Sequence, residues 1–216
     1  MAGQTDIIIT AILDEIERGE LNPGDLIEEQ KLIDNYDVSR TPLREALLKL
    51  EASGLIQRLP RKGAVVFKPT LEEFLAILEV HANLEGQAAA LAARRISASQ
   101  KGELEAAVLA CEAHDRDFGE DRPGAYYRLN MQFHEVVARA AGNPFLLDMI
   151  KTNARKLMAY YRARYSYAGA IATSAREHRE IATLILERKS EEAGESMIRH
   201  VQFDHVTAMD LLAALG

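Results

Sequence analysis

Three histidines of the sequence, His134, His178 and His200, could together bind a divalent metal ion. Asn130 precedes His134 by four residues, so on a helix both side chains would point from the same face. Three imidazoles and one oxygen ligand from neighbouring helices suit Zn²⁺, Ni²⁺ or Mn²⁺ and leave positions open for water or a carboxylate. Spacing alone leaves open the alternative that these are ordinary core or surface histidines of a helical bundle.

A second candidate is a short cationic segment inside an acidic chain. The 216 residues carry a net charge of −7, yet residues 38–68 carry seven basic and two acidic side chains. Because salt screens electrostatic attraction beyond about 8–10 Å, binding to a polyanion depends on this local charge rather than on the average of the chain. Charge by itself would equally describe a solvated basic surface.

The elements predicted around this segment favour DNA binding. A first helix over 4–18 is predicted to turn one apolar face inward (Ile7, Ile8, Ala11, Ile12 and Ile16), and a second covers about 28–36. A third follows within 39–56, with Thr41 as its N-cap and Gly54 closing it. Strands at 55–59 and 64–67 form a hairpin around residues 60–63. Three helices followed by a hairpin is the order of a winged helix-turn-helix.

The third helix carries the predicted DNA contacts. Arg40 and Arg44 lie one turn apart, and arginine binds guanine O6 and N7 in bidentate fashion in the major groove. The short hydroxyls of Ser39 and Thr41 suit the flanking phosphates. The hairpin turn adds two cations and a glycine that permits close backbone approach: Arg61, Lys62 and Gly63.

The rest of the chain is predicted to be uniformly helical. Helices are expected at about 71–94, 98–116, 123–141, 144–166, 174–187 and 189–213, with a capping box of Ser97 and Gln100 before the second of them. The predicted fold is therefore mainly α, with a winged helix-turn-helix over residues 1–68 and an all-α bundle over residues 69–216.

Composition excludes several other classes. The single cysteine, Cys111, excludes an internal disulfide framework and a multi-cysteine zinc site, and we expect it to be buried packing. No apolar run approaches the ~18 residues of a spanning helix, and the first residues lack a signal-peptide pattern. We therefore expect a soluble cytoplasmic protein with no membrane partner.

The segment VSRTPLREALLKLEASGLIQRLPRKGAVV (38–66), preceded by LNPGDLIEEQKLID (21–34), resembles the DNA-binding domain of the GntR family of bacterial transcription regulators. The resemblance implies a winged helix that binds a short palindromic operator as a homodimer. It also implies contacts to double-stranded DNA from Ser39, Arg40, Thr41, Arg44, the hairpin cations and Gly63.

Two further segments, NMQFHEVVARAAGNPFL (130–146) and EHREIATLILERKSEEAGESMIRHV (177–201), resemble the C-terminal FCD domain of the FadR-type branch. Many members bind a divalent metal through one aspartate and three histidines. This implies His134, His178 and His200 as ligands, with Asn130 at the aspartate position. A neutral amide adds no charge to offset the cation, so we expect a weaker site here.

The resemblance also implies a small carboxylate effector held beside the metal. Four candidates to bind it lie on the helix predicted at 144–166: Asn153, Arg155, Tyr160 and Arg164. His81 is a fifth candidate, at a position where many relatives have arginine. His114 and His205 are expected to be surface residues.

These observations favour a metabolite-responsive transcriptional regulator, most often a repressor in this family, and not an enzyme. Two alternatives remain: a metal-dependent enzyme of the bundle, and a constitutive DNA-binding dimer with a vestigial metal site. Against the enzyme, no general base is evident, because Glu135 and Glu177 are expected to face away from the neighbouring ligand candidates.

Overall fold

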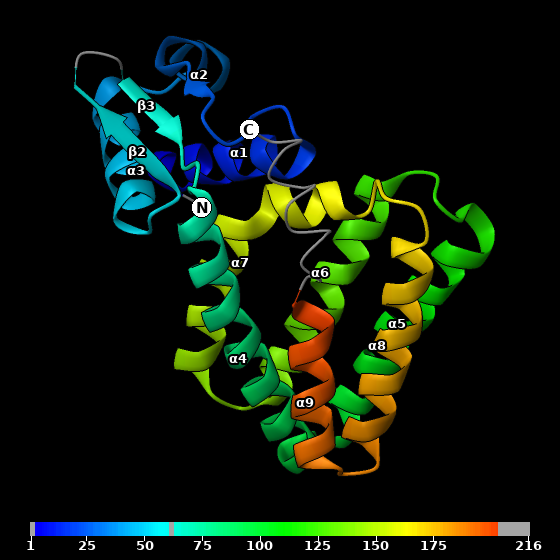
Figure 1. Cartoon of the computed structure of the whole chain (residues 1–216). Helices are drawn as coiled ribbons and strands as arrows, with labels where there is room; N and C mark the ends of the chain where they lie inside the picture. The colour runs from blue at the N-terminus through cyan, green and yellow to red at the C-terminus, as the bar shows by residue number, and fades with distance from the viewer. Residues whose placement is uncertain (1–2, 61–62, 203–216) are drawn as a thin grey trace. The chain divides into compact units, whose positions relative to one another are not determined.

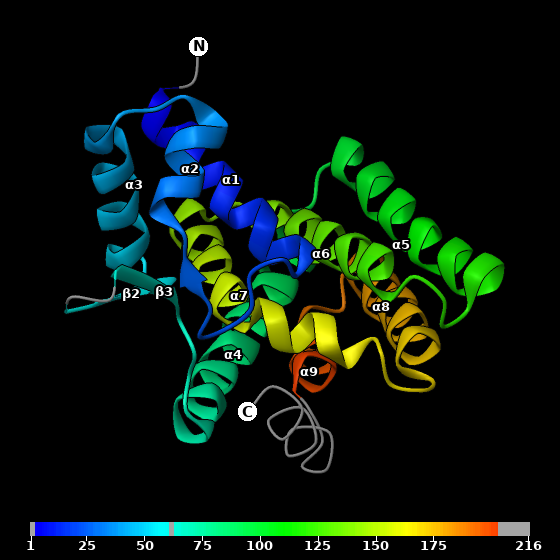
Figure 2. The same cartoon turned by 90° about the horizontal axis from the view of Figure 1, so that it is seen from above.

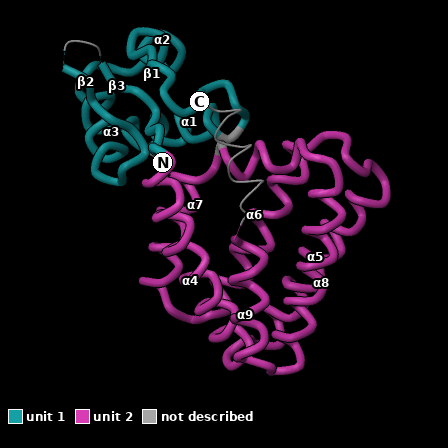
Figure 3. The backbone as a smooth tube through the Cα atoms, in the orientation of Figure 1, with its two compact units in different colours: residues 1–70 teal, residues 71–216 magenta. Residues whose placement is uncertain are grey.

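The computed structural model describes residues 3–60 and 63–202 and divides the chain into two compact units. The first unit ends at Thr70 and the second begins at Leu71 (Figure 3). Within the described part of the chain, no helix has the length and apolar character needed to cross a membrane.

The first unit combines three helices with a small sheet (Figure 1). Its elements are α1 (Gln4–Arg18), β1 (Leu26–Ile27), α2 (Glu29–Tyr36), α3 (Arg40–Ala52), β2 (Ile56–Leu59) and β3 (Gly63–Val66). The strands are antiparallel in the order β1-β3-β2, so the predicted hairpin of β2 and β3 is confirmed. Strand β1 was not predicted, because two residues are too few to show an alternating pattern.

The core of this unit follows the predicted apolar stripes, with two local corrections. Ile8, Ile12 and Ile16 are buried, but Ile7 is 40% exposed because it lies beside the core-facing stripe rather than on it. Ser39, not Thr41, occupies the N-cap position, and its backbone is extended. Helix α3 can begin at Arg40 because a proline without an N–H is tolerated throughout a first helical turn.

The second unit is a bundle of helices, as predicted. Its described helices are α4 (Leu71–Arg95), α5 (Ala98–Phe118), α6 (Pro123–Ala140), α7 (Pro144–Arg164), α8 (Ala170–Leu186) and α9 (Ser190–Val201). Seen from above, α4 and α7 lie on one side of this unit and α5 and α8 on the other, with α6 and α9 between them (Figure 2). The mainly α fold of the prediction is confirmed.

The helix ends of the second unit agree with their local sequence signals. The capping box of Ser97 and Gln100 is formed in both directions. Helix α8 starts at Ala170 rather than at 174, because Gly169 in the left-handed conformation (φ 76°) sets its N-terminus. The predicted extension of the last helix to 213 lies largely outside the described residues.

Among the described elements, helices α4 and α9 pack more extensively on each other than any other pair. They approach closely at two glycines, Gly86 and Gly194. A Cβ atom on Gly86 would lie 2.5 Å from Cγ1 of Ile198 and 2.9 Å from the backbone oxygen of Gly194. The two helices can therefore pack at this distance only because both positions lack a side chain.

Gly86→Ala should lower the free energy of unfolding of the second unit by about 1–3 kcal/mol, because the added methyl group has no space between α4 and α9. Urea denaturation followed by circular dichroism measures this loss. Gly102→Ala is the matched control, because Gly102 lies inside α5 with no atom within 4 Å of an added Cβ. That variant should gain roughly 0.5–1 kcal/mol, and an equal gain in Gly86→Ala would contradict the packing argument.

Candidate metal centre and DNA-binding helix

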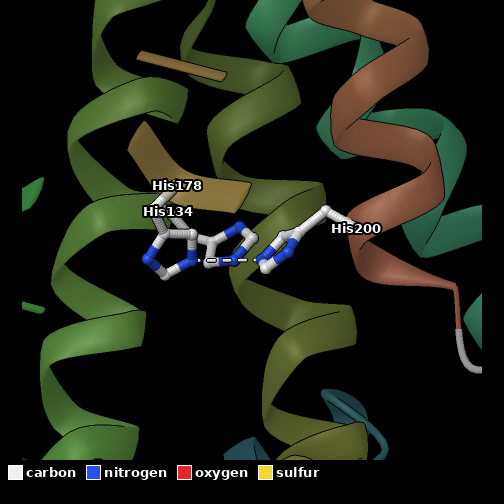
Figure 4. Close-up of side chains that lie close together, drawn as sticks. All are labelled: His134, His178 and His200. Atoms are coloured by element: carbon white, nitrogen blue, oxygen red, sulfur yellow. Dashed lines mark hydrogen bonds between the residues drawn. The ribbon is translucent and has the colours of Figure 1, made fainter. Parts of the chain in front are cut away.

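Three histidines from three helices meet in the core of the second unit (Figure 4). His134 comes from α6, His178 from α8 and His200 from α9, and one ring nitrogen of each lies within 4.8 Å of the others. The Nε2 atoms of His178 and His200 are 3.1 Å apart. The rings of His134 and His200 are stacked with their centroids 5.3 Å apart. Helix packing therefore collects the histidines singled out in the sequence.

Burial keeps two of these imidazoles neutral. It places the pKa of His178 well below its ordinary value, and the neighbouring charges of His200 and His134 lower it further. Burial also lowers the pKa of His200 to about 4, although Glu177 opposes the shift. Neutral imidazoles present the lone pairs that zinc and related metals bind. The described cluster could hold a metal ion, and its donor set fits a divalent cation.

Glu177 orients one of the three rings, which corrects the expectation that it faces away. Its Oε2 lies 2.7 Å from Nδ1 of His200. If Nδ1–H donates to this carboxylate, the lone pair of His200 is on Nε2, which faces His178. Burial raises the pKa of Glu177, but the hydrogen bond from His200 and the charges of Arg164 and Arg176 oppose this and leave the pKa lowered. The sequence could not show it, because it does not reveal that α9 packs beside this face of α8.

Asn130 is buried one turn before His134, but its amide oxygen already has a partner. The Tyr165 hydroxyl donates a hydrogen bond of 2.8 Å to Oδ1 of Asn130 and lies 3.3 Å from Oγ of Ser174. Burial raises the pKa of Tyr165 to about 12, so it is a neutral donor at physiological pH. Asn130 as a metal ligand therefore stays a prediction.

Glu85 on α4 is a buried carboxylate that sequence reasoning missed. It is 1% exposed, and its Oε2 lies 3.3 Å from Nδ1 of His134. Its Oε1 lies 3.7 Å from Nε2 of His81, which is also buried. Burial raises the pKa of Glu85, but its interactions with His134 and, less strongly, with His81 outweigh this and leave the pKa lowered. The sequence did contain a hint of this contact, because Glu85 follows His81 by four residues in a predicted helix that is otherwise rich in alanine.

The effector candidates on α7 differ in their surroundings. Arg164 donates a hydrogen bond of 3.3 Å from Nη1 to the backbone oxygen of His200, so it lies beside the cluster. Tyr160 is buried, Asn153 is half-buried and Arg155 is exposed. Their roles in binding an effector stay predictions.

His114 and Cys111 do not belong to this cluster. The expectation that His114 is a surface residue is wrong: it is 5% exposed, and its Nε2 lies 3.2 Å from the backbone oxygen of Asp121. Its ring packs against Tyr126, which accounts for its burial. His205 lies outside the described residues. Cys111 is buried, and burial raises the pKa of its thiol to about 12, as suits a packing residue.

The start of α3 exposes four of the predicted DNA contacts: Ser39, Arg40, Thr41 and Arg44. Four other residues of the same helix are buried in the core of the first unit: Leu43, Ala46, Leu47 and Leu50. Gly63 has φ +87°, a conformation that glycine adopts without strain. Arg61 and Lys62 lie outside the described residues.

Family models match both units. Residues 4–66 match the gntR family of bacterial regulatory proteins, and residues 76–203 match the FCD domain. The chain belongs to the GntR family. Transcriptional regulation by DNA binding is therefore the activity class of this FCD-containing GntR protein.

Similar curated proteins are regulators as well. The Nta operon transcriptional regulator of Aminobacter aminovorans is 29% identical over 187 residues, which are 85% of each chain. The HTH-type transcriptional repressor GlaR of Escherichia coli is 26% identical over 198 residues, or 87% of each chain. Among solved structures, E. coli McbR/YncC shares the fold with a TM-score of 0.83 at 17% identity, covering 97% of this chain and 99% of that one.

His134→Ala or His200→Ala should lower the affinity for Zn²⁺ by at least about tenfold, because each substitution removes one of three clustered imidazoles. Elemental analysis after dialysis against a buffered Zn²⁺ solution measures the metal bound per chain. His114→Ala, which removes a buried histidine outside the cluster, should bind as much Zn²⁺ as the wild type. Unchanged metal content in the cluster variants would show that these histidines are not ligands.

Proposed function

We propose that this GntR-family protein is a repressor that binds a palindromic operator as a homodimer and is controlled by a small carboxylate bound beside a divalent metal. The observation that carries the proposal is the cluster of His134, His178 and His200 inside the unit that follows the DNA-binding unit. A repressor role is supported by the similar protein GlaR, which is named as one.

The DNA-binding part of the proposal rests on α3. Its N-terminal turns carry Arg40 and Arg44, which are both exposed. Arginines in this place contact base edges in the major groove, while Ser39 and Thr41 contact phosphates. One such helix specifies few base pairs, so a homodimer on a two-fold symmetric operator supplies the remaining specificity.

The sensing part of the proposal rests on the histidine cluster. His134, His178 and His200 would hold the metal, with Asn130 as a further candidate ligand. Three protein ligands leave coordination positions at which a bound metal polarises and anchors a carboxylate. Arg164, which donates a hydrogen bond to the backbone oxygen of His200, would bind the second charge of such a ligand.

A signal can leave this site through the chain itself. The cluster is made from α6, α8 and α9, and α9 packs along α4, the helix that begins directly after the DNA-binding unit. A ligand that binds one packing arrangement of α9 against α4 more tightly shifts the population toward that arrangement. We propose that this shift changes the affinity for the operator.

Thermal-shift measurements against a panel of small organic acids test the sensing function. A carboxylate that binds beside the metal should raise the melting temperature of Zn²⁺-loaded protein and should have no effect after chelation. Loss of operator binding on addition of the same acid, measured by fluorescence anisotropy, completes the test. A metal-loaded protein stabilised by no acid would favour a constitutive DNA-binding dimer, and turnover of a bound acid would favour an enzyme.

Arg44→Ala should weaken binding to the operator by about 1–3 kcal/mol, because it removes one bidentate base contact. The operator is first obtained by selection from random duplexes, and affinities are then compared at one fixed salt concentration. Arg116→Ala removes an exposed arginine from the second unit and serves as the control. Equal operator affinity in Arg44→Ala and the wild type would exclude Arg44 from base recognition.

A further inference from the structure

Glu85 is a carboxylate in the core of the second unit that borders the histidine cluster without belonging to it. It is 1% exposed, and its two oxygens face different imidazoles: Oε2 lies 3.3 Å from Nδ1 of His134, and Oε1 lies 3.7 Å from Nε2 of His81. A carboxylate removed from water is costly unless a positive group compensates it. No lysine or arginine is paired with Glu85 in the described ion pairs, so its burial calls for another explanation.

The nearest unsatisfied group is the outer nitrogen of His134. Nδ1 of His134 and Oε2 of Glu85 are both buried, and neither has a hydrogen-bond partner among the described residues. Each is therefore the partner available to the other. His200 has the same kind of contact, and there it is a hydrogen bond: Nδ1 of His200 lies 2.7 Å from Oε2 of Glu177. Two of the three clustered imidazoles thus have a carboxylate at Nδ1.

The contact between Glu85 and His134 also matters for the charge balance of a bound metal ion. The three imidazoles, and the amide of Asn130 as a candidate fourth group, would all be neutral ligands, so they would not balance the charge of a divalent cation. The other neighbour of Glu85, His81, is an imidazole and not a permanently charged guanidinium, so it does not cancel the negative charge of the carboxylate. In a core of low dielectric constant, a carboxylate in contact with His134 strongly attracts a cation bound to the other nitrogen of that ring.

We propose that Glu85 is a positioning residue of the metal centre. It accepts a hydrogen bond from Nδ1 of His134, which commits Nε2 of that ring as the ligand atom. It also supplies, from outside the ligand set, the negative charge that Asn130 does not provide. This inference rests on the proposed metal binding of the regulator.

Glu85→Gln tests the proposal, because glutamine keeps the size of the side chain and removes its charge. The affinity for Zn²⁺, measured by competition with a chromophoric chelator, should fall about 10- to 100-fold. Glu79→Gln is the matched control, because Glu79 is an exposed glutamate on the same helix. That variant should bind Zn²⁺ as the wild type does.

A second substitution separates positioning from a merely structural role. Asn130→Asp placed in the Glu85→Gln background returns one carboxylate to the site, and we expect it to restore at least tenfold of the lost Zn²⁺ affinity. The metal-free Glu85→Gln protein should melt no lower than the wild type, because the substitution removes a buried charge. In Zn²⁺-loaded wild type, ¹⁵N spectra of the histidine rings should show His134 protonated at Nδ1.

Three results would overturn the proposal while wild-type protein still binds Zn²⁺. The first is an unchanged Zn²⁺ affinity in Glu85→Gln. The second is a Zn²⁺ affinity that is lost in Glu85→Gln and not restored by Asn130→Asp, together with a lower melting temperature of the metal-free Glu85→Gln protein. The third is a proton on Nε2 of His134 in the Zn²⁺-loaded wild type. Wild-type protein that binds no Zn²⁺ at all would instead refute the metal-dependent part of the proposed function. The two failures are therefore distinguishable.

Discussion

The close packing of α4 on α9 is the constraint on which the second unit depends. The two helices meet at Gly86 and Gly194, where an added methyl group has no space at Gly86 and would be tightly packed at Gly194. Glu85 stands next to one of these glycines, and His200 lies on the helix that carries the other. The distance between the two backbones thus determines which polar groups share the core, so packing and chemistry are set by the same contact.

The polar groups collected in this core would be a liability in a purely structural bundle. Buried hydroxyl, amide, imidazole and carboxylate groups each require a partner, and the described contacts provide several, such as Tyr165 to Asn130 and Glu177 to His200. Others are left incomplete, including Nδ1 of His178. Incomplete pairing inside an otherwise well-packed core is typical of a ligand site, because the missing partner is supplied on binding.

Much of this molecule could be predicted from its sequence, and what was missed has a common cause. Helical periodicity and capping signals identified the helices, and the hairpin glycine and strand pattern identified the sheet apart from β1. The three clustered histidines were found from residue type and from resemblance to the FCD domain. The contacts of Glu85 and Glu177 were not found, because each depends on which helix packs beside its own, and periodicity does not contain that information. The burial of His114 was missed for the same reason.

The origin of the three imidazoles on α6, α8 and α9 has a consequence for the lifetime of the protein. Helices α8 and α9 follow one another in the chain, and α6 is separated from them by α7, so a ligand shared by all three acts as a reversible crosslink that closes one long and one shorter loop. Such a crosslink opposes local unfolding and the proteolysis that follows it. Cellular metal supply would then govern how long each copy of the regulator survives.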